Sequence, residues 1–310
     1  MTNALGARIG EYLLERELPA RTTEVAYRAT HRLLPRAARL AILKPAFVGA
    51  RIAEIQLMRE ACVLEALHHT GAPRAFEYGT IDDRPWIATE LVDGTSIEHA
   101  AAQHPISIGE VIGVLRDVAA VLAHAHARGV VHRNLTPRSI VQTPARGFPI
   151  CITEWGDASI HDSAIPYVHD PAARFYRAPE LARGSHGEGQ ADGRVDVFAL
   201  AAVMFEAATL VLPDPVQKFP GVPIAVHRLL AAMMNRNPEE RPTAATVHAD
   251  ARRLAEGFAE GDGAIEEVEV ELVDISRNQP TMASLGWIPP AQVGARPRHA
   301  LGTMRRRKLP

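Results

Sequence analysis

Two short polar segments contain the side chains of this chain that are best suited to chemistry. The first, Val130–Ile140, reads Val-Val-His-Arg-Asn-Leu-Thr-Pro-Arg-Ser-Ile and follows a helical pattern that Gly129 closes. The second is Glu154-Trp155-Gly156, which follows the apolar run Ile150-Cys151-Ile152. The amide of Asn134, at the centre of the first segment, has no basic site and cannot act as a general base.

The first segment resembles the catalytic loop of the protein kinase family, which reads His-Arg-Asp-Leu-Lys-Pro-x-Asn. Further motifs follow in the family's order from about Tyr12 to Leu254, and together they resemble a bacterial serine/threonine kinase of the Hanks type. The resemblance implies an α+β, two-lobed fold, with a small antiparallel sheet lobe and a larger, mainly helical lobe. The positions that have structural roles in the family are matched by His132, Arg133, Glu180, Asp196 and Arg241.

The positions that perform chemistry in the family differ here. Asn134 stands where the family has the acid that accepts the substrate's proton, and loss of a general base typically lowers a rate about 10²- to 10⁴-fold. Thr136 replaces the lysine that steadies the transferred phosphate, and Ser139 replaces an asparagine metal ligand. Glu154 replaces the metal-binding aspartate with a carboxylate one methylene further out, so we expect weak Mg²⁺ binding there.

The nucleotide-binding positions are only partly matched. The resemblance assigns the regulatory-helix glutamate to Glu60, the gatekeeper to Thr89, and the hinge to Glu90 and Val92. The loop Leu18–Glu24, which corresponds to the family's glycine-rich loop, contains no glycine. Backbone amides can approach phosphates closely only where side chains are absent, so we expect no phosphate cradle in this loop.

The family's phosphate-binding lysine has two candidate positions. An alignment without a gap places Ala41 there, whereas a short insertion would place Lys44 there. We favour Ala41, because Leu40 and Ile42 then share one face of a strand and Ala41 points to the other. In that case Glu60 has lost its ion-pair partner, and we interpret it as a solvated helix residue.

Apolar periodicity indicates which elements carry these residues. Spacings of three and four predict a helix over Ile52–Leu67, and Ser107 with Glu110 forms a capping box that begins another helix. Alternating runs predict strands early in the chain, with Asp82-Asp83 as a hairpin turn. The predicted strands are Glu11–Leu14, Glu24–Ala29, Arg39–Leu43 and two within Tyr78–Val92; the further predicted helices are Val195–Thr209, Ala225–Met234 and Ala244–Gly257.

We predict an N-terminal arm over residues 1–10, a small lobe over 11–92, a large lobe over 93–257 and a tail over 258–310. Within the tail, segment 266–275 alternates charged and apolar residues, which is typical of a half-buried strand; a disordered acidic segment is the alternative. The basic end, residues 305–308, is interpreted as solvated.

Composition limits the class of protein. The 310 residues are 47% hydrophobic, enough for one large domain or for two lobes with cores. The net charge of −2 argues against a protein that mainly coats nucleic acid or anionic membranes. No apolar run reaches the roughly 18 residues of a membrane span, and Met1–Gly10 lacks the regions of a signal peptide, so we expect a cytoplasmic protein. Cys62 and Cys151 have no metal-ligand spacing, and we expect both to be buried.

Two functions are consistent with these residues. The first is a catalytically impaired pseudokinase that acts as a protein-binding or regulatory module, with an unknown protein partner in a kinase signalling pathway. The alternative is a divergent ATP-dependent serine/threonine kinase, or another nucleotide transferase, with weak activity through Lys44, Glu60 and Glu154. Weak binding of ATP, with or without Mg²⁺, is the one cofactor interaction that the resemblance implies; no nucleic acid is expected.

Overall fold

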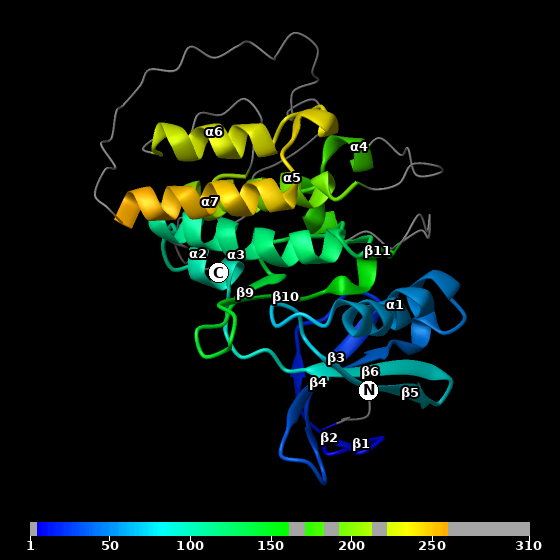
Figure 1. Cartoon of the computed structure of the whole chain (residues 1–310). Coiled ribbons are helices and arrows are strands. Elements are labelled where there is room, and N and C mark those ends of the chain that lie inside the picture. The colour runs from blue at the N-terminus through cyan, green and yellow to red at the C-terminus, as the bar shows by residue number, and fades with distance from the viewer. Residues whose placement is uncertain (1–4, 161–170, 183–191, 213–221, 260–310) are drawn as a thin grey trace, which may run out of the picture. The chain divides into compact units, whose positions relative to one another are not determined.

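The first lobe is built on a six-stranded antiparallel sheet (Figure 1). The computed structural model describes residues 5–160, 171–182, 192–212 and 222–259, all of which belong to one unit, Met1–Val268. The predicted strands are confirmed, and so is the turn at Asp82-Asp83, where both residues have positive φ. In sheet order the strands are β1 (Arg8–Ile9), β2 (Tyr12–Leu18), β3 (Glu24–His31), β4 (Ala37–Leu43), β6 (Arg84–Glu90) and β5 (Ala75–Ile81).

The two faces of this sheet bury different side chains. Because side chains alternate along a strand, β4 directs Leu40 and Ile42 to one face, where they pack with Trp86. It directs Ala41 and Leu43 to the other face, which packs against helix α1 (Arg51–Leu67). The residues of the sheet that lie beside α1 are therefore the ones that can reach the candidate site.

Helix α1 confirms the predicted helix, but it buries an unexpected face. The apolar spacing that predicts this helix runs through Ile52 and Cys62, yet Ile52 is 40% exposed and Cys62 is exposed. The buried residues instead include Gln56, Arg59 and Glu60. The helix contacts the short helix η2 (Trp155–Asp157) as well as the sheet, and polar partners are available there. The expectation that Cys62 is buried is therefore wrong, whereas Cys151 is buried as expected.

The second lobe is mainly helical, as predicted. Helix α3 (Ile108–His126) begins with the predicted capping box at Ser107 and Glu110, and α7 (Ala244–Ala259) runs alongside it (Figure 1). The core of the lobe is α5 (Arg194–Thr209), which is buried on nearly all sides. The remaining elements are α2 (Ile97–Ala101), α4 (Pro179–Ala182), α6 (Ile224–Met233), η1 (Pro45–Phe47), η3 (Pro171–Phe175), η4 (Pro238–Glu240), β7 (Thr95–Ser96), β8 (Val130–Val131), β9 (Ile140–Gln142), β10 (Ile150–Ile152) and β11 (Ser159–Ile160).

Parts of the predicted organisation lie outside the described residues. These include the tail's candidate strand, residues 266–275, and its basic end, residues 305–308. Among the helices that the structure describes, none is long and apolar enough to cross a membrane.

Asp196 on α5 holds the backbone of the loop that carries His132 and Arg133. One carboxylate oxygen accepts the backbone N–H of His132 at 2.8 Å and contacts His126 Nε2 at 2.9 Å, and the other accepts that of Arg133 at 2.7 Å. Burial would raise the pKa of Asp196, but the hydrogen bond and charge of His126 outweigh it, so the pKa is lowered. Arg133 has φ of 63°, a left-handed backbone that this anchoring supports.

A second tie within this lobe joins Arg241 to Glu180. The guanidinium donates through Nη1 and Nη2 to the two carboxylate oxygens at 2.6 and 2.9 Å. The side chain of Arg241 is fully buried, so this bidentate pair fixes η4 against α4.

We predict that Asp196→Asn lowers the free energy of unfolding by about 3 kcal/mol, because the new amide nitrogen faces N–H groups that need an acceptor. Urea unfolding followed by circular dichroism measures the change. Asp83→Asn is the matched control: Asp83 is exposed in a turn with positive φ, which Asn tolerates, so its effect should stay within about 0.5 kcal/mol. Equal effects for the two variants would contradict the anchoring role of Asp196.

Candidate functional site

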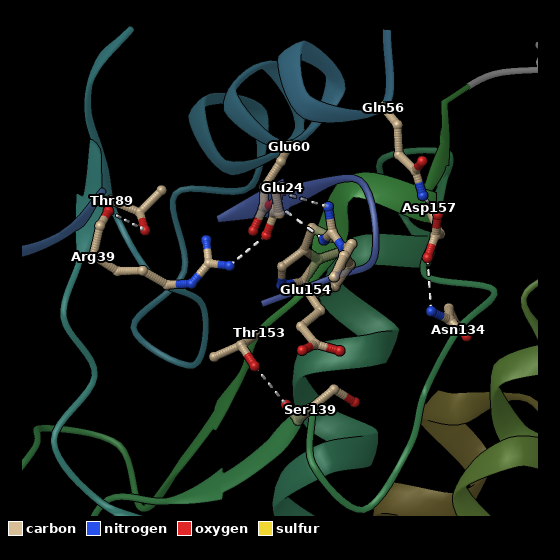
Figure 2. Close-up of polar contacts among 12 residues, drawn as sticks. Glu24, Arg39, Gln56, Glu60, Thr89, Asn134, Ser139, Thr153, Glu154 and Asp157 are labelled. Atoms are coloured by element: carbon tan, nitrogen blue, oxygen red, sulfur yellow. Dashed lines mark hydrogen bonds and ion pairs between the residues drawn. The ribbon is translucent and has the colours of Figure 1, made fainter. Parts of the chain in front are cut away.

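Four charged side chains gather between β4, α1 and the connection from β2 to β3. We call Arg21, Glu24, Arg39 and Glu60 the charged cluster; Figure 2 shows Arg39 extending from β4 toward Glu24, with Glu60 reaching in from α1. Arg21 Nη2 lies 3.0 Å from Glu60 Oε2, and Arg21 Nη1 lies 3.9 Å from Glu24 Oε2. Arg39 Nη2 lies 2.5 Å from Glu24 Oε1. Each carboxylate therefore has at least one guanidinium partner.

The charged cluster is shielded from solvent. The side chains of Glu24 and Glu60 are 2% and 6% exposed, and that of Arg21 is 11% exposed. Burial would raise the pKa of Glu24, but Arg39 and Arg21 outweigh it, so the pKa is lowered. Burial would lower the pKa of Arg21, but Glu60 and Glu24 outweigh it, so the pKa is raised. Mutual pairing thus keeps Glu24 and Arg21 ionised at neutral pH.

The partner of Glu60 comes from the loop between β2 and β3. Ala41 is fully buried against Leu57 and Ala61 of α1, whereas Lys44 follows the end of β4 and donates Nζ to the backbone oxygen of Thr22 at 2.9 Å. The interpretation of Glu60 as a solvated residue is wrong, since it is buried and paired with Arg21.

Arg21 also extends to the Glu154-Trp155-Gly156 segment. A β-carbon on Gly156 would collide with the Arg21 guanidinium, so this glycine permits the close approach of the cation. Arg21 therefore bridges a loop of the first lobe, helix α1 and the segment expected to bind metal.

A second polar contact joins α1 to the loop that carries Asn134, through the buried carboxylate of Asp157. Gln56 Nε2 donates to Asp157 Oδ1, and Asn134 Nδ2 donates to Asp157 Oδ2 at 2.6 Å (Figure 2). Arg133 Nε donates to the backbone oxygen of Asp157 at 2.8 Å. The amide at the catalytic-acid position is thus used as a hydrogen-bond donor within the protein.

The remaining candidate catalytic residues are engaged in local contacts. Glu154 Oε1 lies 2.9 Å from Arg138 Nη2, so a protein cation already pairs with the carboxylate expected to bind Mg²⁺. Thr136 and Ser139 bond to each other: Ser139 Oγ accepts the Thr136 N–H and donates to the Thr136 carbonyl oxygen, both at 2.9 Å. Their hydroxyls stabilise the turn of the loop.

The residues assigned to the gatekeeper and hinge lie at the end of β6 and just after it. Thr89 is buried, and its Oγ1 lies 3.5 Å from the Arg39 carbonyl oxygen. Glu90 accepts two hydrogen bonds from Arg146, at 2.8 and 3.2 Å, and Arg146 also donates to the carbonyl oxygens of Thr70 and Ala72. Val92, two residues further on, is half-buried. Arg146 therefore clamps the connection between the two lobes.

Sequence reasoning missed five of these functional positions, and four of them are arginines. The loop Leu18–Glu24 lacks glycine but contains Arg21, a cation that can replace the lost lysine. A buried glutamate without a lysine signals that another cation must be near, because an isolated buried charge is very unfavourable. The missed residues are Arg21, Arg39, Arg138, Arg146 and Asp157.

The side chains do not fit ATP with Mg²⁺ in the way that the family binds it. Glu60 pairs with Arg21 and not with a lysine, and the carboxylate at the metal position is paired with Arg138. The loop that would present backbone amides has no glycine and places its Arg21 against Gly156. Among the described residues, no group of three or more His, Cys, Asp or Glu side chains could hold a metal ion.

Comparisons with known proteins agree with the two-lobed fold. A family model described as protein kinase domain matches residues 44–251. The serine/threonine-protein kinase PknJ of Mycobacterium tuberculosis is 27% identical over 283 residues, which cover 83% of this chain and 47% of PknJ. The crystal structure of the M. tuberculosis PknI kinase domain matches with a TM-score of 0.62 and 26% identity, covering 83% of this chain and all of that domain. This chain thus spans less than half the length of PknJ.

We predict that Glu24→Gln lowers the free energy of unfolding by about 3 kcal/mol at pH 7, because Arg39 loses its buried counter-charge. The lowered pKa of Glu24 stabilises the fold above pH 4.5, its ordinary pKa, and this contribution is lost as pH falls through the folded-state pKa. The stability gap between the two proteins should therefore shrink below that pH. Urea titrations from about pH 7 to pH 3.5 measure it, with the exposed Glu239→Gln as control. A gap that is independent of pH would contradict the pairing of Glu24.

Asn134→Asp should destabilise the protein at pH 7 and less so at pH 5. The substitution places a second carboxylate beside Asp157 Oδ2, where the amide nitrogen now lies at 2.6 Å, and two carboxylates so close share a proton. The double variant Asn134→Asp/Asp157→Asn exchanges amide and carboxylate, so it should recover most of the loss. Thermal unfolding at the two pH values tests this, and a single variant as stable as the wild type at pH 7 would disprove the contact.

Proposed function

Because this chain belongs to the protein kinase family, we propose that it is a pseudokinase: a kinase fold without phosphotransfer that acts by binding another protein. The observation that carries the proposal is the charged cluster, in which protein side chains pair with one another where the family binds nucleotide phosphates. Its place of action is a signalling pathway in the cytoplasm, with a partner protein still to be identified.

The energetics of the charged cluster oppose nucleotide binding. A phosphate group that took Arg21 would leave Glu60 buried without its cation, and one that took Arg39 would do the same to Glu24. Breaking a buried ion pair by removing one partner costs about 3–5 kcal/mol, which offsets much of the attraction between an arginine and a phosphate. A nucleotide would also add its negative charge beside two buried carboxylates.

The catalytic positions support the same proposal. Asn134 has no basic site for the proton of a substrate hydroxyl, and its amide is held by Asp157. Thr136 supplies no charge to a transferred phosphate, and Glu154 is neutralised by Arg138. Phosphoryl transfer depends on positioning and charge neutralisation, and these side chains provide neither.

The alternative, a divergent kinase that uses Lys44, finds less support in the contacts. Lys44 Nζ is bonded to the backbone of Thr22, while Glu60 is paired with Arg21. For Lys44 to pair with Glu60, the bond from Lys44 to Thr22 and the ion pair between Arg21 and Glu60 would both have to break.

A protein-binding role is favoured by the ties between the two lobes. Gln56 and Arg59 of α1 bond to Asp157 and Ala158, and Arg146 clamps Glu90. A surface that is already ordered loses less conformational entropy when a partner binds. Contacts made by the protein's own side chains thus support a fixed arrangement of the two lobes for a partner to bind.

We predict that ATP, ADP and a non-hydrolysable ATP analogue, at millimolar concentration with and without Mg²⁺ or Mn²⁺, leave the melting temperature unchanged. A ligand at 100 times its Kd would stabilise the fold by about 2.7 kcal/mol, equivalent to several degrees, so the test is sensitive. The matched variant Arg21→Ala/Ala41→Lys returns the cation to the strand beside α1 and should gain a nucleotide-dependent shift. A shift of several degrees in the wild type, or Mg²⁺-dependent phosphorylation that Glu154→Ala abolishes, would overturn the proposal.

A further inference from the structure

The outward face of α1 carries an apolar seam with a charge at each end. Ile55 and Met58 are partly exposed and Cys62 is exposed, with Arg51 on the preceding turn and Glu65 on the following one, both exposed. Two further apolar side chains extend the patch near the start of the helix: Val48 is 43% exposed and Ile52 is 40% exposed. We call Arg51, Ile55, Met58, Cys62 and Glu65 the α1 seam.

The spacing of the α1 seam is that of a helix-pairing surface. Its members follow one another at intervals of four, three, four and three residues, which places all five on one side of the helix. An alternation of three and four is the pattern by which one helix packs along another. The opposite side of α1 is occupied by the sheet and η2, so within the described part of the chain the seam is the side of α1 left for another molecule.

The charges of the α1 seam are self-complementary about its centre. Arg51 lies seven residues before Met58 and Glu65 lies seven residues after it. If a second α1 packs antiparallel with Met58 at the crossing point, Arg51 of each copy meets Glu65 of the partner subunit, twice by symmetry. A parallel arrangement would instead set like charges against each other.

Both charged residues are available for such a contact. Among the described residues, Arg51 forms no ion pair, and the ion-pair contact of Glu65 is a long one, 3.9 Å from Oε2 to His68 Nε2, with a Glu65 side chain that is 64% exposed. Glu54, the nearest other carboxylate to Arg51 on the helix, accepts the backbone N–H of Gly49 at 2.8 Å.

We infer that the α1 seam is a self-association surface, through which two copies of this chain form an antiparallel, two-fold α1–α1 contact centred on Met58. A single pair of helices buries less than a standard interface of about 1,600 Å², so the dimer is weak, with a Kd on the order of micromolar. The charged cluster and the Asp157 contact hold the inner face of α1 in place. The α1 seam lies on the outer face of this fixed helix.

Sedimentation velocity of the full chain, from about 1 to 200 μM, tests the inference with a charge exchange. Arg51→Glu and Glu65→Arg should each weaken self-association about tenfold, because each replaces two attractive contacts by two repulsive ones. The double variant Arg51→Glu/Glu65→Arg should return to within about twofold of the wild type. Each single change also places its charge favourably for the helix dipole, so weaker association would not reflect unfolding of α1.

The matched control uses Arg252 and Glu256, an exposed ion pair on α7 with Nε and Oε1 3.0 Å apart. Arg252→Glu, Glu256→Arg and the double variant should all leave self-association unchanged. A chain that stays monomeric at all concentrations overturns the inference. So does a dimer that ignores the single changes, or a double variant no better than the singles, since either would mean that another surface or partner is used.

Cross-linking locates the two-fold axis independently. In a Cys62→Ser background, Met58→Cys should form an intermolecular disulfide under mild oxidation, because residue 58 meets its own copy at the crossing. Ala66→Cys in the same background should not, because eight residues of helix on each side separate the two thiols by about 24 Å. Equal cross-linking of the two variants would overturn the antiparallel arrangement. These variants leave the charged cluster intact, so they do not alter the nucleotide test of the proposed function.

Discussion

The buried ion pair between Arg21 and Glu60 is the constraint on which the candidate site depends. A carboxylate that is 6% exposed needs a nearby cation; position 41 of β4 is an alanine, and the arginine that β4 does contribute, Arg39, pairs with Glu24. The loop between β2 and β3 supplies it instead, which brings a guanidinium against Gly156. A loop that holds Arg21 in this position cannot also direct its backbone amides to a phosphate. The loss of the lysine and the absence of glycines therefore have the same consequence, the loss of a phosphate-binding site.

The same logic applies at Asp157. Its buried carboxylate needs hydrogen-bond donors, and Gln56 and Asn134 provide them from α1 and from the loop of the second lobe. The amide of Asn134 therefore has a structural role at the position of the family's acid. An aspartate there would place a second carboxylate at hydrogen-bonding distance from Asp157. In both cases side chains from different elements satisfy one another's charge or hydrogen-bonding needs.

Much of the fold followed from local pattern. The capping box at Ser107 and Glu110, the turn at Asp82-Asp83 and the helix over α1 were predictable, because each depends on residues close together in the sequence. Which face of α1 is buried was harder to predict from the sequence. Periodicity indicated a helix, but Cys62 is exposed while Glu60 is buried, because the polar loop segment at η2 receives one face of the helix.

By itself, the sequence determined the main strands of the sheet and the longer helices, which family the chain resembles, and which side chains occupy the catalytic positions, including Asn134 and Glu154. These conclusions require only residue identity and short-range spacing. Only the tertiary structure decided which groups meet: that Arg21 pairs with Glu60, that Arg138 pairs with Glu154, and that an apolar seam of α1 faces outward. Ion-pair partners separated by many residues are set by how strands, loops and helices pack, and no local pattern encodes that arrangement.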